Sequence, residues 1–327
     1  MRARIIGTGR YLPKKVLTNK DFEKMVETTD EWIVSRTGIR ERRIAADNEF
    51  TSTMGVEAAK KALESAHLKA DDIDLILVAT LTPDYIFPSV ACLIQEALGA
   101  KCAAMDFQAA CTGYLYGLAI AKGFIESKVY KNILLIASEK LSSIVDYEDR
   151  ATCVLFGDGA SACVISDKGD GFEILDCVLG ADGSQSELII QPAGGSKMPA
   201  SAESVEKKLH TIKMEGRETF KHAVRRMVEA CQECLEKNHI KEEEIDWMLT
   251  HQANDRIIEA VAKRFNIEDE KVYKTIHKYG NTSASSIGIA FDELIEEKTI
   301  DLEQHLLLTA FGSGLTWGAT ILKKVKQ

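Results

Sequence analysis

The chain is 327 residues long and carries 41 Lys and Arg against 50 Asp and Glu, a formal net charge of −9 at pH 7. Hydrophobic residues make up 45% and charged residues 28%, an ordinary globular composition, and the length allows about two domains or one large α/β unit. The acidic balance argues against nucleic acid as the main partner, because phosphate binding needs a surplus of Lys and Arg, and no apolar run approaches the ~18 residues that span a bilayer.

The cysteines and the N-terminus indicate the compartment. Eight cysteines are scattered along the chain. A chain of this size does not need disulfides for stability, so we expect reduced thiols. The first residues lack the extended apolar core of a signal peptide. We therefore expect a cytoplasmic protein that is not associated with a membrane.

In chain order, helical spacing and short apolar runs predict an alternation of helices and strands. Residues 51–68 place apolar side chains at helical intervals. The other segments predicted as helices are 113–126, 217–237, 254–264 and 284–297. The runs predicted as buried strands of a largely parallel sheet are Leu75–Ala79, Ile133–Ala137, Met248–Thr250 and Leu306–Thr309. Residues 181–207 are rich in Gly, Ser, Ala and Pro and are predicted to form a long loop insertion.

The chain contains an internal repeat. Residues 67–80 resemble residues 239–252, an offset of 172, and residues 132–138 resemble residues 304–310 at the same offset. Chance similarity between helix–loop–strand segments is the alternative explanation. Two α/β units of similar plan predict a duplicated, layered α/β fold rather than two independent domains.

Cys111 is the first candidate for chemistry. It lies in a run of small residues that leads into the helix predicted from residue 113. The dipole and the free N–H groups of a helix start stabilise a thiolate and lower the pKa of the thiol. Cys111 is therefore a candidate nucleophile. The alternative is a small hydrophobic core residue, which is the usual role of a cysteine.

His251 and Asn281 are the next candidates. His251 follows the strand predicted to end at Thr250, and ligands of α/β sheets collect at the carboxyl ends of strands. Asn281 precedes the helix predicted over 284–297 and lies 170 residues after Cys111. The two helix starts are thus near-equivalents in the two halves and would face each other about a pseudo-twofold axis. A loop histidine and an ordinary helix N-cap are the alternatives.

Trp32 and nearby cations suggest a nucleotide site. Thr28 and Glu31 have the spacing of a capping box, and Trp32 and Arg36 lie four residues apart on one face of the helix that would follow. Further basic residues come shortly after, at Arg40, Arg42 and Arg43. An aromatic plane beside several cations suits an adenine nucleotide with its phosphates. A solvated helix face anchored by one Trp is the alternative.

Two other motifs have more than one interpretation. The glycines of residues 311–318 would let backbone N–H groups point at a ligand, or would form a tight turn. Cys231 and Cys234 form a single Cys-x-x-Cys inside a predicted helix, without a second pair at zinc spacing. Packing on a helix face therefore explains this pair better, and the sequence predicts no metal site.

Basic residues also gather on two predicted helices. These residues are Lys221, Arg225, Arg226, Arg256, Lys263 and Arg264. On an acidic protein such a stripe can recruit an acidic partner. A solvated charged face is the alternative.

Taken together, the motifs resemble those of the β-ketoacyl-acyl-carrier-protein synthase III family, condensing enzymes of the thiolase-fold superfamily that initiate type II fatty-acid synthesis. The stretches that carry the resemblance are Ile5–Pro13, Thr29–Ile33, Arg36–Arg42, Ala110–Gly113, Phe156–Ala160, His251–Asn254, Gly280–Ser283 and Phe311–Gly318. The resemblance implies an α/β, thiolase-like, duplicated five-layer αβαβα fold. Residues 1–170 would form the half that carries the nucleophilic Cys, and residues 171–327 the half that carries His and Asn.

The resemblance also implies the chemistry. Cys111 would attack the thioester of a short acyl-CoA, with acetyl-CoA the expected primer, and hold the acyl group. The backbone N–H groups of Cys111 and Ser313 would form the oxyanion hole. His251 and Asn281 would stabilise the enolate formed when malonyl-acyl-carrier protein loses CO2. The reaction needs no metal and no redox cofactor, because coenzyme A enters as the substrate thioester.

The same resemblance assigns binding residues. The CoA-binding residues would be Thr28, Trp32, Arg36, Arg150, Gly216, Phe220 and Asn254, with Trp32 and Arg150 stacking on either side of the adenine. Lys221 and Arg256 would receive the acidic carrier protein. Phe87 would enter the acyl pocket of a dimer partner, which implies a homodimer. Ser313 and Arg217 depart from residues that other members can carry, Gly and a neutral residue respectively.

Other functions stay open at this point. A related condensing enzyme of secondary metabolism would use the same residues with other acyl groups. A Cys-dependent thioester hydrolase needs the Cys–His pair but does not explain Asn281, and an acyl-CoA-binding module would not require a nucleophile. The sequence does not indicate the preferred primer, because one methylene is worth only ~1–3 kcal/mol of discrimination.

Overall fold

The computed structural model describes residues 2–327. Its strands are β1 (Arg4–Tyr11), β2 (Lys15–Thr18), β3 (Glu41–Ile44), β4 (Leu75–Ala79), β5 (Ala103–Phe107), β6 (Asn132–Glu139), β7 (Gly159–Ser166), β8 (Gly171–Ile174), β9 (Val178–Ala181), β10 (Ile189–Ile190), β11 (Lys213–Met214), β12 (Ile245–Thr250), β13 (His305–Gly312) and β14 (Thr316–Val325). Its α-helices are α1 (Asn19–Phe22), α2 (Asp30–Thr37), α3 (Thr51–Ser65), α4 (Val90–Leu98), α5 (Gly113–Glu126), α6 (Arg150–Cys153), α7 (Ala202–Glu206), α8 (Gly216–Asn238), α9 (Asp255–Arg264), α10 (Ile276–Tyr279) and α11 (Ser285–Glu297). The 3-10 helices are η1 (Ala70–Asp72), η2 (Ala110–Thr112), η3 (Leu141–Ile144), η4 (Gly183–Leu188), η5 (Glu242–Glu244) and η6 (Asp269–Lys271).

One long sheet runs through the molecule in the order β12-β13-β14-β8-β1-β7-β6-β4-β5, and β9 adds to β14. The parallel pairs are β4–β5, β4–β6 and β12–β13. The pairs made by β1, β7, β8, β9 and β14 are antiparallel. The expectation of a largely parallel sheet is therefore wrong. The apolar runs of the sequence correspond to β4, β6, β12 and β13, which form the parallel pairs. The antiparallel strands lie between these two groups in the sheet.

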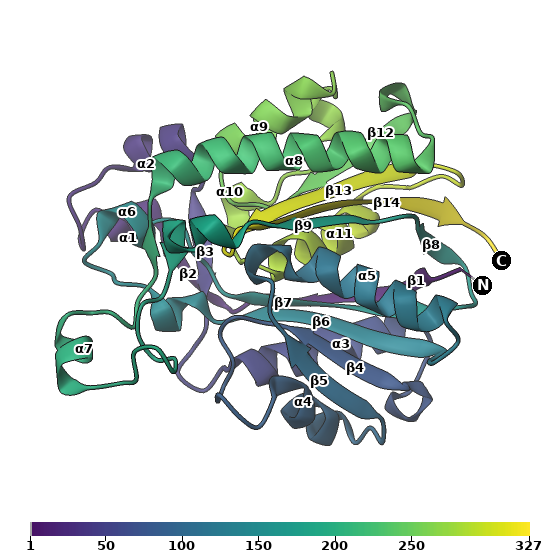
Figure 1. The fold of residues 1–327 in the computed structure, drawn as a ribbon, viewed down its shortest axis with the longest axis horizontal. Helices are drawn as coiled ribbons and strands as arrows, with labels where there is room; N and C mark the ends of the chain where they lie inside the picture. Colours follow the sequence, from purple (N-terminus) through teal and green to yellow (C-terminus); the bar gives the residue numbers. More distant parts are fainter. Residues whose placement is uncertain (1) are drawn as a thin grey trace.

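The helices and strands form five layers (Figure 1). α3 and α4 pack on one side of the β1-to-β5 part of the sheet, and α8 and α9 pack on one side of the β12-to-β14 part. α5 and α11 lie between the two parts. The predicted αβαβα architecture is confirmed, and β8 joins its two sheet layers by hydrogen bonds to β1 and β14.

Alternation along the strands explains why their apolar runs are continuous. In β4, Leu75, Leu77 and Ala79 face the middle layer, whereas Ile76 and Val78 face α3 and α4. A strand covered by helices on both sides buries both sets of side chains, so no polar face interrupts the run. β6 repeats the pattern with its odd-numbered and even-numbered residues.

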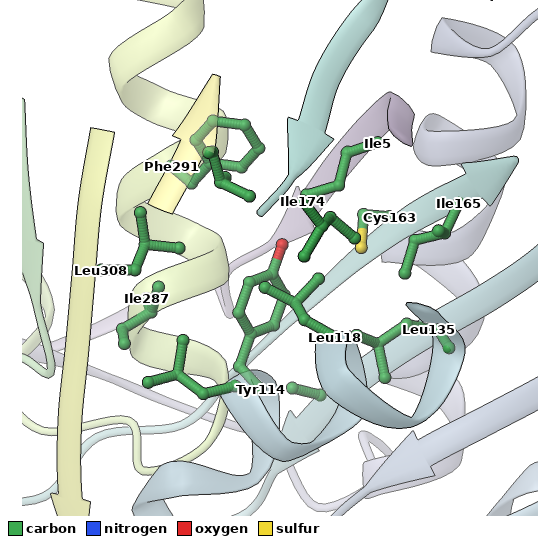
Figure 2. Close-up of a cluster of buried hydrophobic side chains, with 14 of the residues drawn as sticks. Ile5, Tyr114, Leu118, Leu135, Cys163, Ile165, Ile174, Ile287, Phe291 and Leu308 are labelled. Carbon is green, nitrogen blue, oxygen red and sulfur yellow. The ribbon is translucent and has the colours of Figure 1, made fainter. Parts of the chain in front are cut away.

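The middle layer holds the largest shared core (Figure 2). Tyr114 of α5 lies at its centre, surrounded by side chains from both halves of the chain, including Ile5, Ile287 and Leu308. Phe291 of α11 meets Phe172 of β8 edge to face, with ring centroids 5.0 Å apart. This core therefore holds α5 and α11 in a fixed relation to each other.

The internal repeat is visible in the hydrogen bonds. The Asp74 carboxylate accepts a hydrogen bond from the backbone of Asn132 at 2.9 Å, and the Asp246 carboxylate accepts one from the backbone of His305, also at 2.9 Å. η1 and η5, which precede these aspartates, also lie 172 residues apart. Equivalent aspartates in the two halves thus hold the neighbouring parallel strand, β6 beside β4 in the first half and β13 beside β12 in the second.

The bounds of one predicted strand and four predicted helices agree closely with the structure. β4 has the predicted bounds, and α5, α8, α9 and α11 differ from their predicted bounds by at most one residue at each end. Residues 181–207 are not a featureless loop, because they contain η4, β10 and α7, and β10 pairs with β11. No helix among residues 2–327 is long and apolar enough to cross a membrane.

We expect Leu308→Ala to lower the free energy of unfolding by about 2–5 kcal/mol, because it opens a cavity in the middle layer. Leu308 is fully buried, whereas Leu302 is 54% exposed. Leu302→Ala is therefore a matched control and should change stability by less than about 0.5 kcal/mol. Urea denaturation followed by tryptophan fluorescence measures both. Equal losses in the two variants would contradict the assignment of Leu308 to the core.

Candidate active site

Cys111 lies between the edge strand β5 and the buried helix α5. It is the middle residue of η2, which is followed directly by α5 from Gly113. Ala110, just before it, has a φ of +45°, a left-handed conformation that non-glycine residues rarely adopt. The chain thus turns sharply in front of Cys111, and α5 extends away behind it.

The loop after β13 packs directly against Cys111. A Cβ atom added to Gly312 would lie 2.8 Å from the backbone nitrogen of Cys111, too close for any side chain. Only glycine therefore allows the 312–314 turn to approach Cys111 this closely. This approach places the backbone of the turn beside the Cys111 N–H, where an oxyanion hole requires donors.

The resting thiol of Cys111 is not acidified. Burial raises its pKa to about 12, although part of the side chain reaches solvent. The expectation that the helix start lowers the pKa of Cys111 is therefore wrong, because desolvation of the thiolate outweighs the helix-start effect. Formation of the nucleophile needs a group that removes the thiol proton.

His251 follows β12 directly and is almost fully buried, at 3% exposure. Its Nδ1 makes a 2.7 Å hydrogen bond with the Ser286 hydroxyl, which also accepts a hydrogen bond from the Gln252 backbone. Ser286 can then donate its own proton to Nδ1, which leaves the imidazole proton on Nε2. Burial lowers the pKa of His251 to about 3, so the imidazole is neutral near pH 7.

Asn281 lies between α10 and α11 and is 7% exposed. Its side-chain oxygen accepts a 2.8 Å hydrogen bond from the Ser283 backbone, so its amide nitrogen is the group left to donate to a ligand. Its own backbone is fixed on both sides by Leu155 and Gly157. The side-chain amide of Asn281 is thus fixed through its oxygen, and its Nδ2 can donate a hydrogen bond to another group.

The segment 281–286 brings the three candidates together. Ser286 holds His251, and the Ser283 hydroxyl offsets part of the rise in the pKa of Cys111 that burial causes. A Cβ atom on Gly113 would lie 3.0 Å from the Cβ of Ala284, so the starts of α5 and α11 are in contact. The expectation that these two helix starts face each other agrees with this contact.

Trp32 and Arg150 meet on the surface. The Arg150 guanidinium lies 5.1 Å from the centroid of the Trp32 ring, and its Nη1 donates to the carbonyl of Glu27. An adenine ring stacked between Trp32 and Arg150 would need a contact of about 3.5 Å on each face. The two side chains would therefore have to move apart to admit it. The hydroxyl of Thr28, nearby in the chain, is buried and without a hydrogen-bond partner among the described residues.

The capping box expected from Thr28 and Glu31 is not formed. Thr29 is the N-cap of α2, and its hydroxyl accepts a 3.0 Å hydrogen bond from the Trp32 backbone. Thr29 is one position nearer to Trp32, where its side chain reaches the third N–H of the helix. This arrangement leaves the hydroxyl of Thr28 uncommitted.

The other predicted CoA-binding residues surround the starts of α8 and α9. Asn254 caps α9 and donates a 2.9 Å hydrogen bond to the carbonyl of Arg36, so it joins α9 to α2. Phe220 of α8 packs beneath Arg256 of α9, with the guanidinium 5.5 Å from the ring centroid. Gly216 is the exposed first residue of α8. These residues and Trp32 therefore belong to one surface region.

Lys221 and Arg256 are both exposed in this region. Lys221 forms a 2.7 Å ion pair with Glu218, whereas Arg256 makes no ion pair among the described residues. Arg217, the departure from the family pattern, is exposed at the start of α8. Of the two side chains, Arg256 is therefore the one whose positive charge is not neutralised by a neighbouring carboxylate among residues 2–327.

Ser313 and Phe87 are the remaining residues that the sequence predicted for the site. The Ser313 hydroxyl donates a 2.6 Å hydrogen bond to the carbonyl of Ile189 in β10, so it ties the 312–314 turn to the 181–207 segment. Phe87 is 84% exposed on the loop between β4 and α4. Within one chain Phe87 is therefore not part of the core.

The structure adds residues that the sequence analysis did not consider. Ser283 and Ser286 lie in the hydroxyl-rich run after Asn281, and Glu139 is a fully buried carboxylate at the end of β6. Two features of the sequence could have pointed to these residues. One is the run of small hydroxyl residues after Asn281, and the other is a carboxylate directly after the apolar run of β6. Among residues 2–327 no group of three or more His, Cys, Asp or Glu is arranged to hold a metal, and Cys231 and Cys234 are buried free thiols.

Comparison with known proteins gives one consistent family. A family model described as 3-oxoacyl-[acyl-carrier-protein (ACP)] synthase III matches residues 105–183, and the model of its C-terminal part matches residues 235–324. The chain is 57% identical to the β-ketoacyl-[acyl-carrier-protein] synthase III of Chlamydia muridarum, over 99% of this chain and 100% of that protein. It is similar to the crystal structure of 3-oxoacyl-[acyl-carrier-protein] synthase III from Aquifex aeolicus VF5, with a TM-score of 0.90 and 51% identity over 98% of this chain and 99% of that one. The priming β-ketosynthase of the R1128 polyketide biosynthetic pathway is similar at 32% identity, with a TM-score of 0.90 over 100% of this chain and 97% of that one.

The buried, neutral His251 predicts a pH dependence of stability. Its pKa is about 3 in the folded protein against an ordinary value of 6.5. The unfolded chain therefore binds a proton below pH 6.5 that the folded chain does not, and stability is lost as the pH falls from 6.5 toward 3. Between pH 7 and pH 5 this loss should be about 2 kcal/mol.

His251→Asn removes the titrating ring and should make the fall in unfolding free energy between pH 7 and pH 5 shallower by that amount. Urea denaturation of both proteins at the two pH values measures it. If the wild type and His251→Asn lose the same stability, the histidine is not held neutral.

Proposed function

The chain belongs to the 3-oxoacyl-[acyl-carrier-protein] synthase III family, and we propose that its Cys111, His251 and Asn281 condense a short acyl-CoA with malonyl-acyl-carrier protein. The products are a 3-oxoacyl-acyl-carrier protein, CoA and CO2, and acetyl-CoA is the proposed primer. The protein is accordingly an acyltransferase that starts fatty-acid biosynthesis. The observation that carries the assignment of these residues is their convergence on the segment 281–286.

In the first half-reaction, the Cys111 sulfur attacks the carbonyl carbon of the acyl-CoA thioester. The negative charge that develops on the carbonyl oxygen is stabilised by the N–H groups of Cys111 and Ser313, which the close approach of Gly312 makes neighbours. The CoA thiolate leaves, and the acyl group stays on Cys111. The oxyanion hole uses backbone donors, so Ser313 can serve although other members can carry Gly there.

In the second half-reaction, malonyl-acyl-carrier protein enters and loses CO2. His251 donates from Nε2 and Asn281 from its amide nitrogen to the thioester oxygen, which stabilises the enolate. Both donors are suited to this role because neither needs to titrate near pH 7. The resulting carbanion attacks the acyl group on Cys111 and releases the product. No step requires a metal or a redox cofactor.

CoA would reach Cys111 from the surface region around α2, α8 and α9. Trp32 and Arg150 would enclose the adenine, and Arg36 would meet the phosphates. The hydroxyl of Thr28 lacks a partner, which suits contact with the ligand. The residues that would line the pantetheine path are Gly216, Phe220 and Asn254. The exposed Lys221 and Arg256 would then attract the acidic carrier protein to the same entrance.

We propose a homodimer formed through the edge strand β5. β5 ends the sheet, and its Met105 is 40% exposed. The Asp106 carboxylate holds the start of α4 with 2.7 Å hydrogen bonds, which keeps the 85–87 loop near β5. Tyr85, Ile86 and Phe87 expose 60% to 84% of their surface there. An unpaired edge beside a large apolar loop favours pairing with a second copy, and Phe87 would then enter the partner's acyl pocket.

Further parts of the proposal rest on the sequence. We place the two functional halves at residues 1–170 and 171–327, and the protein in the cytoplasm, without nucleic-acid or membrane partners. A condensing enzyme of secondary metabolism is the alternative that one observation favours, since the polyketide-priming enzyme has the same fold. Initial rates with acetyl-, isobutyryl- and longer acyl-CoA primers at fixed malonyl-acyl-carrier protein separate the two functions.

We expect Cys111→Ala to abolish transfer of the labelled acetyl group from acetyl-CoA to the protein, because the sulfur that forms the thioester is absent. Asn281→Ala is the matched control: it should keep the labelling but lower condensation by about 100-fold or more, since a donor to the enolate is lost. Mass spectrometry of the intact protein and product assay with malonyl-acyl-carrier protein measure the two steps. Labelling of Cys111→Ala at a stoichiometric level would rule out Cys111 as the nucleophile.

Met105→Arg should shift the protein from twice the chain mass of 36.1 kDa to the monomer, because a charge at the centre of the edge strand opposes pairing. Met25→Arg is a matched control, since Met25 is 44% exposed and lies outside β5. Sedimentation velocity measures both proteins. A dimeric Met105→Arg with a monomeric Met25→Arg would place the interface elsewhere.

A further inference from the structure

Two threonine hydroxyls join the Cys111 segment to the turn after β13. Thr112 follows Cys111 directly and is fully buried, and Thr316 is the first residue of β14. Their side-chain oxygens form a 2.7 Å hydrogen bond, which we call the hydroxyl pair. Since 204 positions separate the two residues in the chain, the hydroxyl pair exists only in the folded protein.

Each hydroxyl of the pair also reaches a backbone carbonyl. Thr112 Oγ1 lies 2.5 Å from the carbonyl oxygen of Ala109. Thr316 Oγ1 lies 3.0 Å from the carbonyl oxygen of Ser313 and 3.2 Å from that of Ala109. Two hydroxyl oxygens 2.7 Å apart need a proton between them, so the second proton of the pair is left for one of the carbonyls. Whichever hydroxyl donates to the other, the contact ties η2 to the start of β14.

The two segments that the hydroxyl pair joins carry the proposed oxyanion donors. Cys111 precedes Thr112 in η2, and Ser313 follows Gly312, whose added Cβ atom would lie 2.8 Å from the Cys111 nitrogen. Among residues 2–327, neither the backbone nitrogen of Cys111 nor that of Ser313 donates a hydrogen bond to another residue. An oxyanion hole requires such unoccupied donors, held in a fixed relation to each other.

Two other contacts hold the turn, and both bind it to the 181–207 segment. One is the 2.6 Å hydrogen bond from the Ser313 hydroxyl to β10. The other is a pair of backbone hydrogen bonds of 2.8 and 2.9 Å between Leu315 and Asp182. Neither contact fixes the turn relative to Cys111. The hydroxyl pair does so, because it joins η2 to β14 directly.

We propose that the hydroxyl pair of Thr112 and Thr316 positions the oxyanion hole, by fixing the Ser313 N–H relative to the Cys111 N–H. This inference rests on the proposed function, because the oxyanion is the one formed when Cys111 takes up an acyl group. Thr112 and Thr316 are positioning residues, since they act through the backbone of their segments. An oxyanion hole works by preorganisation, so displacement of one donor slows acyl transfer even when both donors are still present.

Single-turnover acetylation by acetyl-CoA, followed by intact-protein mass spectrometry, tests the proposal. Thr112→Val and Thr316→Val each remove one hydroxyl at nearly constant volume. In both variants we expect the acetylation rate constant to fall by about 10- to 100-fold, while the half-saturating acetyl-CoA concentration changes less than about 3-fold. Thr316→Ser keeps the hydroxyl and should recover most of the rate. Wild-type rates in both valine variants would overturn the proposal.

Alkylation by iodoacetamide distinguishes positioning of the oxyanion hole from general damage to the site. Iodoacetamide reacts with the sulfur at a saturated carbon and expels iodide, so no oxyanion develops. Peptide mass spectrometry reads the rate at Cys111, which in both valine variants should stay within about 2-fold of the wild type. A loss of alkylation as large as the loss of acetylation would mean that the variants only damage the site, and the proposal would be wrong.

A double variant tests whether the two hydroxyls act as one unit. Thr112→Val/Thr316→Val should be at most about 3-fold slower in acetylation than the slower single variant, because each single change already removes the same contact. Multiplication of the two single effects would contradict the hydroxyl pair as the unit that acts.

Thr309 provides the matched control. It is a fully buried threonine of β13, and its hydroxyl donates a 3.0 Å hydrogen bond to the carbonyl of Gly318 in β14. Thr309→Val therefore loses a comparable bond between the same two strands without touching η2, and should keep the wild-type acetylation rate. A loss as large as that of Thr316→Val would show that any buried hydroxyl here has this effect, against the proposal.

Acylation by p-nitrophenyl acetate separates this inference from the proposed function. Attack by Cys111 on this ester forms an oxyanion of the same kind but needs no CoA. The burst of p-nitrophenolate gives the acylation rate, and Cys111→Ala gives the background. If the wild type reacts with p-nitrophenyl acetate but not with acetyl-CoA, only the proposed substrate is wrong. Equal bursts in the wild type, Thr112→Val and Thr316→Val would overturn the role of the hydroxyl pair.

Discussion

The contact between the starts of α5 and α11 is the constraint on which the rest of the structure depends. Gly113 and Ala284 meet at a distance that admits no larger side chain, and Tyr114 and Phe291 continue the contact into the shared core. The two helices come from different halves of the chain, and each begins at a candidate active-site segment. Packing in the middle layer therefore brings the segments that carry Cys111 and Asn281 together.

The proposed binding region and the proposed reaction site differ in burial. Arg150 is exposed and Trp32 is half-buried, so the proposed nucleotide region is open to solvent. The site around Cys111 is buried, which raises the pKa of the thiol to about 12 and lowers that of His251 to about 3. Neutral donors suit enolate stabilisation, but a buried thiol needs a proton acceptor.

Much of the fold and part of the site could be predicted from the sequence. Strands covered on both faces have unbroken apolar runs, so β4 and β6 were visible, and the 172-residue repeat is a property of the sequence alone. The antiparallel strands β1, β7 and β14 are harder to predict because glycine and small or polar residues interrupt their apolar runs. The sequence predicts a loop over residues 181–207 because the short elements there are held by residues far away in the chain. One example is Ser313, whose hydroxyl donates a hydrogen bond to β10.

The sequence by itself determined the repeat, the family and the residue types that bear the chemistry, because these depend on order and spacing. Only the tertiary structure decided the protonation of those residues. The helix start that favours a thiolate at Cys111 is local, but desolvation by surrounding layers is not, and desolvation is the larger effect.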